Sequence, residues 1–92
     1  IGVTAFDFME DDRLRFQNDH AAANETSITM AVRPELVQLE RIRNGEELPI
    51  AVAGADPRTD ASREYGMEIL EMNVNALCRG IGELLNKEKL TL

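Results

Sequence analysis

The stretch from Asp60 to Lys87 constrains the fold more than any other part of the chain. Apolar residues recur there at spacings of three and four, which places them along one side of an α-helix. These residues are Ala61, Tyr65, Ile69, Leu70, Val74, Leu77, Ile81, Leu84 and Leu85. Thr59 or Asp60 can supply the side-chain oxygen that caps the start of the helix. The pattern predicts a long amphipathic helix that covers a core.

Three glycines and one cysteine lie inside this expected helix. Gly66, Gly80 and Gly82 each cost a helix interior about 1 kcal/mol relative to alanine, so we expect close packing against another element to compensate. Cys78 is the single cysteine and cannot form an internal disulfide. Its apolar surroundings favour a small buried side chain with a structural role.

Two further elements precede the long helix. The run from Ile1 to Met9 is apolar almost throughout, which is typical of a strand covered on both faces. The abrupt apolar start also suggests a chain cut from a larger one. Residues Ala21 to Arg33 favour a helix that stops before Pro34, because proline disfavours helical geometry in the residue before it. A strand followed by a helix favours an α/β fold.

The middle of the chain gives weaker signals. Glu35 to Ile42 alternates weakly and is either a short edge strand or an extended link, and it is followed by the turn signal Asn44-Gly45. Leu48 to Gly54 is a short apolar run, and Pro49 restricts any strand there to a short one or to an edge.

Length and charge limit the possible functions. The chain has 92 residues, of which 43% are hydrophobic and 29% charged, so we expect one domain spanning residues 1–92. Its net charge of -7 would repel nucleic acid and anionic membranes. The sequence contains neither an apolar run long enough to cross a bilayer nor an export signal. We therefore expect a cytoplasmic protein.

Three residues near the start of the first helix could carry chemistry. His20 is the only histidine, and imidazole is the side chain best suited to moving protons at neutral pH. Asp19 adjoins it and could orient the ring or bind substrate. Glu25 falls in the first helical turn, where a carboxylate interacts well with the helix dipole, or it could act as a metal ligand or base. A catalytic metal normally takes at least three protein ligands, so His20 and Glu25 cannot complete such a site.

The residues around His20 also resemble a known family. Residues 20–27 (HAAANETS) and 30–37 (MAVRPELV) are similar to the carboxyl-terminal signature of the creatininase (creatinine amidohydrolase) family. That signature runs His, two small residues, two variable residues, Glu-Thr-Ser, an apolar helix, then Pro, an acidic residue and Leu-Val. Residues 56–57, 61–62, 66 and 69–71 look like the final helix of the family. The resemblance covers nearly all of the chain, and its two blocks agree in order and spacing.

The resemblance implies a fold and an activity. It implies the carboxyl-terminal part of an α/β/α sandwich with a mostly parallel sheet, assembled as an oligomer. The implied reaction is metal-dependent hydrolysis of a non-peptide, often cyclic, amide C–N bond in a small-molecule substrate. Two divalent ions per site, zinc, manganese or iron, would act beside His20 as proton carrier. Glu25 would be a second catalytic residue and a metal ligand, and Asp19 would bind substrate.

One departure from the family shapes this hypothesis. The family takes most of its metal ligands from an early Glu-x-His motif, a following Asp and a later His, and none of these is present in the chain. The other ligands would therefore lie outside this chain. We expect activity only together with an amino-terminal companion chain of the same hydrolase.

Two alternatives come from other functional classes. The long amphipathic helix could serve a non-catalytic interaction or assembly subunit, in which His20 has no special role. A hydrolase that pairs His20 with a nucleophilic serine is disfavoured, because the sequence has no Gly-x-Ser-x-Gly motif.

Overall fold

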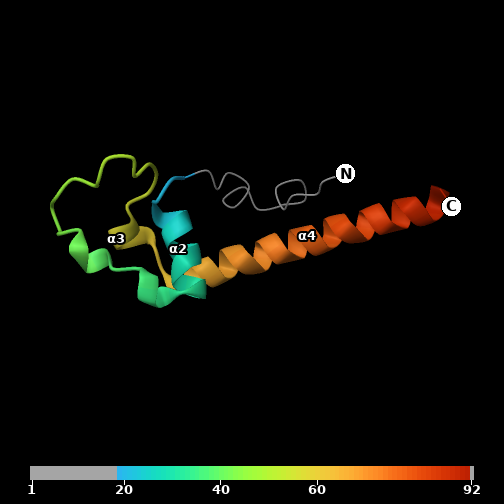
Figure 1. Cartoon of the computed structure of the whole chain (residues 1–92), viewed down its shortest axis with the longest axis horizontal. Coiled ribbons are helices and arrows are strands. Elements are labelled where there is room, and N and C mark those ends of the chain that lie inside the picture. Colours follow the sequence, from blue (N-terminus) through green and yellow to red (C-terminus); the bar gives the residue numbers. More distant parts are fainter. Residues whose placement is uncertain (1–18, 92) are drawn as a thin grey trace. The chain divides into compact units, whose positions relative to one another are not determined.

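The computed structural model describes residues 19–91, with side chains up to Lys87. Along the chain lie helix α2 (Ala23–Val32), the short 3₁₀ helices η2 (Pro34–Leu36) and η3 (Leu39–Arg41), the single-turn helix α3 (Pro57–Asp60) and the long helix α4 (Arg63–Thr91) (Figure 1). The strand expected over Ile1 to Met9 lies outside the described residues. Within residues 19–91, the chain divides after Ile69 into two units, and most of α4 belongs to the second.

The prediction of an α/β/α sandwich with a mostly parallel sheet is wrong for this structure. Residues 19–91 form helices and loops, and their one β pairing is an isolated antiparallel bridge between His20 and Ala53. Proline explains part of the difference, because it cannot donate to a strand ladder. Pro34 opens η2, so the segment expected as an edge strand or link forms two 3₁₀ turns. Pro49 starts a turn closed by the Val52 N–H, which donates to the Pro49 oxygen at 3.1 Å.

Helix α2 matches the prediction for residues 21–33. It ends at Val32, and the Arg33 N–H closes it by donating to the Thr29 oxygen at 2.7 Å before Pro34 prevents continuation. Its buried residues are small, namely Ala23 and Ser27. Small side chains let neighbouring backbone approach closely, and α2 packs against α3 and η2.

Helix α4 confirms the long helix but begins later than expected. Asp56 caps α3 by accepting the Arg58 N–H, and Pro57 occupies the first helical position. The chain then leaves the helix at Ala61 and restarts at Arg63. Ser62 caps α4, because its hydroxyl accepts the Tyr65 N–H at 3.0 Å. The prediction that Thr59 or Asp60 caps the long helix is therefore wrong.

Gly66 marks the point where α4 meets α2. A Cβ at this position would lie 1.8 Å from the Ser27 carbonyl oxygen and 3.0 Å from the Ala31 Cβ. The Ser27 hydroxyl, wholly buried, accepts the Ser62 N–H at 3.0 Å. Close packing at Gly66 is thus confirmed, whereas a Cβ added to Gly82 would have no described atom within 4 Å outside its own helix.

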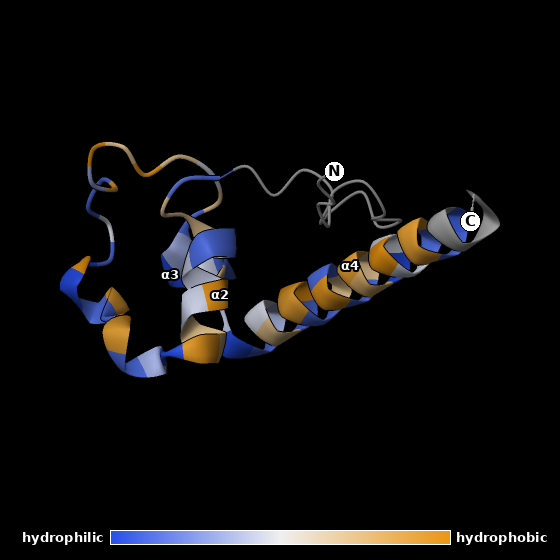
Figure 2. Cartoon of the chain, turned by 45° about the vertical axis from the view of Figure 1, so that its right-hand side comes forward, coloured by the Kyte–Doolittle hydropathy of each residue, from blue (hydrophilic) through white to orange (hydrophobic). Residues whose placement is uncertain are grey.

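The part of α4 beyond Ile69 carries large apolar side chains that remain half exposed. Val74, Ile81 and Leu85 are 54%, 50% and 55% exposed. Apolar residues alternate with polar ones along this helix in Figure 2. Cys78 is also exposed, so the expectation of a buried thiol is wrong. Within residues 19–91, no helix has both the length and the apolar character needed to span a bilayer.

Candidate functional site

Two hydrogen bonds to Ala53 fix the backbone of His20. Its N–H donates to the Ala53 oxygen at 2.9 Å, and its oxygen accepts the Ala53 N–H at 2.9 Å. The side chain itself is exposed, and it has no hydrogen-bond partner among the described residues. The arrangement therefore presents a free imidazole from a fixed backbone position.

Asp19 caps helix α2 from outside the helix. Ala22 occupies the N-cap position and has no side-chain acceptor, so the first amides of α2 need another partner. The Asp19 carboxylate accepts the Asn24 N–H through Oδ2 at 2.7 Å and the Glu25 N–H through Oδ1 at 3.3 Å. A negative charge at this end is also favoured by the helix dipole. Both carboxylate oxygens thus have a structural task, and a contact with substrate stays a prediction.

Glu25 folds back toward the segment that carries the histidine. Its Oε2 accepts the Ala21 N–H, four residues earlier in the chain. Ala21 has φ +52°, a left-handed conformation that alanine rarely adopts. The Glu25 contact fixes that turn directly after His20. The second oxygen, Oε1, has no partner within the described part of the chain.

The loop at Gly54 packs against the segment that contains Asp19 and Ala22. Gly54 has φ +133°, and a Cβ there would lie 2.7 Å from the Asp19 Cβ and 2.9 Å from the Ala22 Cβ. The next residue, Ala55, accepts the Ala23 N–H at 3.0 Å. Only glycine fits this position, for both conformational and steric reasons. The apolar run ending in Gly54 was visible in the sequence, but its role in holding the candidate site was not.

A groove of about 370 Å³ lies beside Glu25, and we call it the Glu25 groove. Its lining is mostly apolar, with two hydroxyls, one amide and one carboxylate. The lining residues are Ala21, Glu25, Thr26, Thr29, Leu36, Val37, Gln38, Leu39, Ile42 and Pro57. No sequence pattern indicates this groove, because it forms only where η2 and η3 bring its far wall back onto α2.

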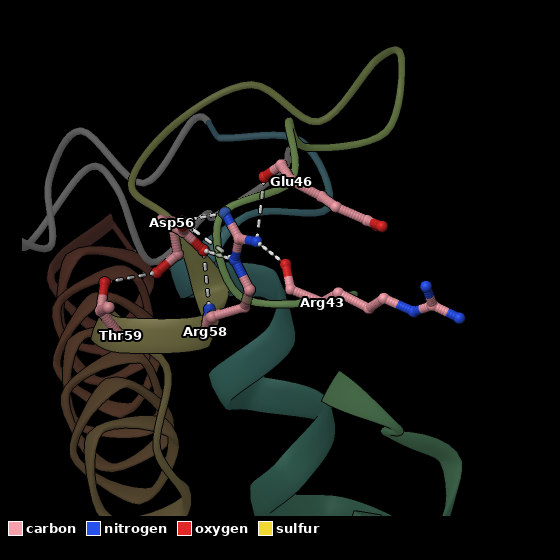
Figure 3. A network of polar contacts seen from close by, with 5 residues as sticks. All are labelled: Arg43, Glu46, Asp56, Arg58 and Thr59. Carbon is pink, nitrogen blue, oxygen red and sulfur yellow. Dashed lines mark hydrogen bonds and ion pairs between the residues drawn. The ribbon is translucent and has the colours of Figure 1, made fainter. Parts of the chain in front are cut away.

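A second polar cluster surrounds Arg58 (Figure 3). Its Nη2 donates to the Asp56 carboxylate at 2.8 Å, and Nη1 donates to the backbone oxygens of Arg43 and Glu46. The side-chain hydrogen bonds between the partners lower the pKa of Asp56 and raise that of Arg58. Thr59 donates to the Asp56 backbone oxygen at 3.3 Å. The guanidinium fastens the turn at residues 43–46 onto α3, so we assign it a structural role.

The side chains expected to bind metal do not form a complete site within this chain. In residues 19–91, no group of three or more His, Cys, Asp or Glu side chains gathers so that it could hold a metal ion. The free Glu25 oxygen and the exposed His20 ring are compatible with a site completed by other atoms. Asp19 and Glu25 bind backbone amides at the start of α2, and their proposed roles beside His20 stay predictions.

Comparison with known proteins gives no further assignment. No family model, curated protein or solved structure matches this chain.

Proposed function

We propose that this chain supplies the proton-carrying histidine to a creatininase-like, metal-dependent amidohydrolase that an amino-terminal companion chain completes. The enzyme would cleave the C–N bond of a non-peptide amide. The main support is the placement of His20, an exposed residue whose backbone is bonded to Ala53 and which directly precedes the capped start of α2. The similarity of residues 20–27 and 30–37 to the family signature supports the same reaction.

His20 would protonate the leaving nitrogen. An amide nitrogen leaves poorly as an anion, so its departure requires a proton delivered as the C–N bond breaks. An imidazole meets this need at neutral pH if its position is fixed. The His20–Ala53 bridge and the capped start of α2 fix the backbone on both sides of the ring.

Glu25 and Asp19 would contribute in different ways. The free Glu25 oxygen can bind a divalent cation or accept a substrate N–H, while its other oxygen holds the turn after His20. When bound, divalent metal ions would polarise the amide carbonyl and lower the pKa of a coordinated water. Asp19 would position the histidine by fixing the start of α2, in addition to its predicted contact with substrate.

The test requires the chain together with the polypeptides that co-purify with it. Intact mass identifies any companion, and metal analysis with an amide-hydrolysis assay follows. We expect His20→Ala to lower turnover at least about 100-fold while metal content is retained. Glu47→Ala, which changes an exposed acid outside the site, should leave turnover unchanged. Near-normal turnover in the His20→Ala assembly would rule out the proposed role.

The exposed face of α4 favours a second candidate function. Val74, Ile81 and Leu85 are at least half exposed, as expected for a helix that docks on a partner. In that case the chain would be a non-catalytic assembly subunit. Val74→Lys with Ile81→Lys would then release the partner, and the purified complex would contain neither divalent metal nor amidase activity. Metal and His20-dependent activity in the complex would exclude this alternative.

A further inference from the structure

We infer that the Glu25 groove binds the acyl part of the substrate, so that the preferred substrates are amides of small apolar carboxylic acids. This inference rests on the proposed function, because it names the substrate class of the same site. It adds a determinant of specificity that the sequence resemblance did not contain.

The size and lining of the groove fit a small, mostly apolar ligand. Its volume of about 370 Å³ lies within the range of about 300–1,000 Å³ that is usual for small-molecule sites. Val37, Leu39 and Ile42 are half-buried along its far wall, and Pro57 is fully buried. Such a wall can cover one side of an aliphatic or aromatic group.

The polar end of the groove selects a hydrogen-bond donor. Glu25 Oε2 is held by the Ala21 N–H, which leaves Oε1 to accept an N–H from a ligand. The Glu25 backbone is also fixed, because the Thr29 hydroxyl donates to its carbonyl oxygen at 3.1 Å. A primary or secondary amide offers this donor, whereas a carboxylate offers none and is repelled by the Glu25 charge.

The described residues that line the groove include no cationic side chain, which also favours an amide over a carboxylate. Neither lysine nor arginine is among the described residues that line the groove, so no cationic side chain there would pair with an anion. The free acid formed by hydrolysis would therefore bind less well than the amide. This asymmetry favours release of the acid product.

The groove reaches the residue that follows the proposed proton carrier, although His20 itself is not among the residues that line it. Ala21, which follows His20 directly, lines the groove together with Glu25. An apolar acyl group in the groove would leave its amide at the Ala21 end. There the reacting C–N bond would be next to the segment that carries His20.

Three probes separate the contributions of the apolar body and of the donor. Benzamide has both, acetamide has the amide without the ring, and benzoate has the ring without the N–H. Each is titrated into the full chain, and chemical shifts are followed by NMR. We expect benzamide to shift the Thr26, Val37 and Leu39 resonances, with a Kd at least about tenfold lower than for acetamide or benzoate. Equal affinity for all three, or shifts confined to other residues, would overturn the inference.

Two variants test the polar end of the groove. Glu25→Gln keeps an oxygen that can accept the Ala21 N–H but removes the charge. We expect this substitution to raise the Kd for benzamide about threefold. The ratio of the benzoate Kd to the benzamide Kd should fall. Glu47→Gln removes one exposed charge outside the groove and should change neither value. If Glu25→Gln changed neither the benzamide Kd nor the benzoate Kd relative to wild type, the role given to Glu25 would be contradicted.

The binding measurements and the turnover assay can give opposite outcomes, so a failure of this inference can be told apart from a failure of the proposed function. Selective benzamide binding in the chain alone, together with normal turnover in the His20→Ala assembly, would keep the groove and remove the catalytic role. Loss of turnover in His20→Ala without selective binding to the chain would keep the catalytic role and overturn the groove.

Discussion

The beginning of α4 and its later half contain the same residue type in opposite surroundings. At Gly66 the helix passes so close to α2 that a Cβ would overlap the Ser27 carbonyl oxygen. At Gly82 a Cβ would meet no described atom within 4 Å outside its own helix. Ile69, one turn after Gly66, is wholly buried, whereas Ile81 beside Gly82 is 50% exposed.

The difference shows how far a glycine in a helical sequence pattern predicts close packing. Its absent side chain permits a close approach, but it does not supply the neighbour that approaches. At Gly66 that neighbour is the α2 backbone, and the pair Ser27–Ser62 fixes the contact with a buried hydrogen bond. We therefore expect an added methyl group to be costly at Gly66 and mild or favourable at Gly82.

The largest effect is expected at the contact between α2 and α4. Gly66→Ala places a methyl group against a backbone oxygen, which cannot rotate away as a side chain can. We expect the free energy of unfolding to fall by about 3 kcal/mol, because overpacking of this kind commonly costs about 1–3 kcal/mol and sometimes more. Urea denaturation followed by far-UV circular dichroism measures the change. A change below about 0.5 kcal/mol, the usual range for an uninvolved surface position, would show that the two helices do not meet at Gly66.

The next effect concerns the buried hydroxyl at the same contact. Ser27→Ala removes the acceptor of the Ser62 N–H and leaves that donor without a protein partner. We expect a loss of about 2 kcal/mol, within the range for an unsatisfied buried polar group. Amide hydrogen exchange should show faster exchange at Ser62, with little change at Ala53, which belongs to the separate bridge to His20. Unchanged protection of the Ser62 amide would contradict the assigned hydrogen bond.

A smaller effect is expected at the cap of α4. Ser62→Ala removes the hydroxyl that accepts the Tyr65 N–H but keeps the backbone N–H that donates to Ser27. We expect a loss of about 1 kcal/mol, the usual cost of an N-cap serine. Ser62→Asp retains a capping oxygen and should recover most of this loss. If alanine and aspartate were equally stable at this position, the cap would contribute nothing measurable.

Local signals predicted the helices but not the way in which they are joined. The spacing of apolar residues located α4, and Pro34 located the end of α2. The start of α4 was misplaced because Asp56-Pro57 begins a helical turn of its own, and the chain leaves that turn before Ser62. The parallel sheet was inferred from short apolar runs and from a family resemblance. A strand also requires a pairing partner, and among residues 19–91 only the His20–Ala53 bridge provides one.

The candidate site could be predicted in its residue types but not in its contacts. Asp19, His20 and Glu25 stand out in the sequence as acids beside a single imidazole. Asp19, however, reaches amides five and six residues further along, which depends on the left-handed turn at Ala21. The support from Gly54 depends on a loop that is distant in the sequence. Neither the turn nor the loop produces a periodic pattern that a sequence can show.

The smallest expected effect lies in the later half of α4 and has the opposite sign. Gly82→Ala adds a methyl group where no described atom outside the helix obstructs it, and it restricts the unfolded chain. We expect stability to rise by about 0.5–1 kcal/mol, the usual gain when alanine replaces glycine inside a helix. The midpoint of urea denaturation measures the rise, with Gly66→Ala as the matched substitution of opposite sign.

The Gly82→Ala substitution also tests whether a partner chain packs against this part of α4. If Gly82→Ala stabilises the isolated chain but weakens its association with a co-purifying companion, the added methyl group obstructs a close approach by that companion. The exposed Ile81 and Leu85 side chains would then belong to the same contact. If stability rises and association is unchanged, no partner backbone approaches at Gly82. A fall in stability of the isolated chain would contradict the lack of a described neighbour at Gly82, and with it the difference between Gly66 and Gly82.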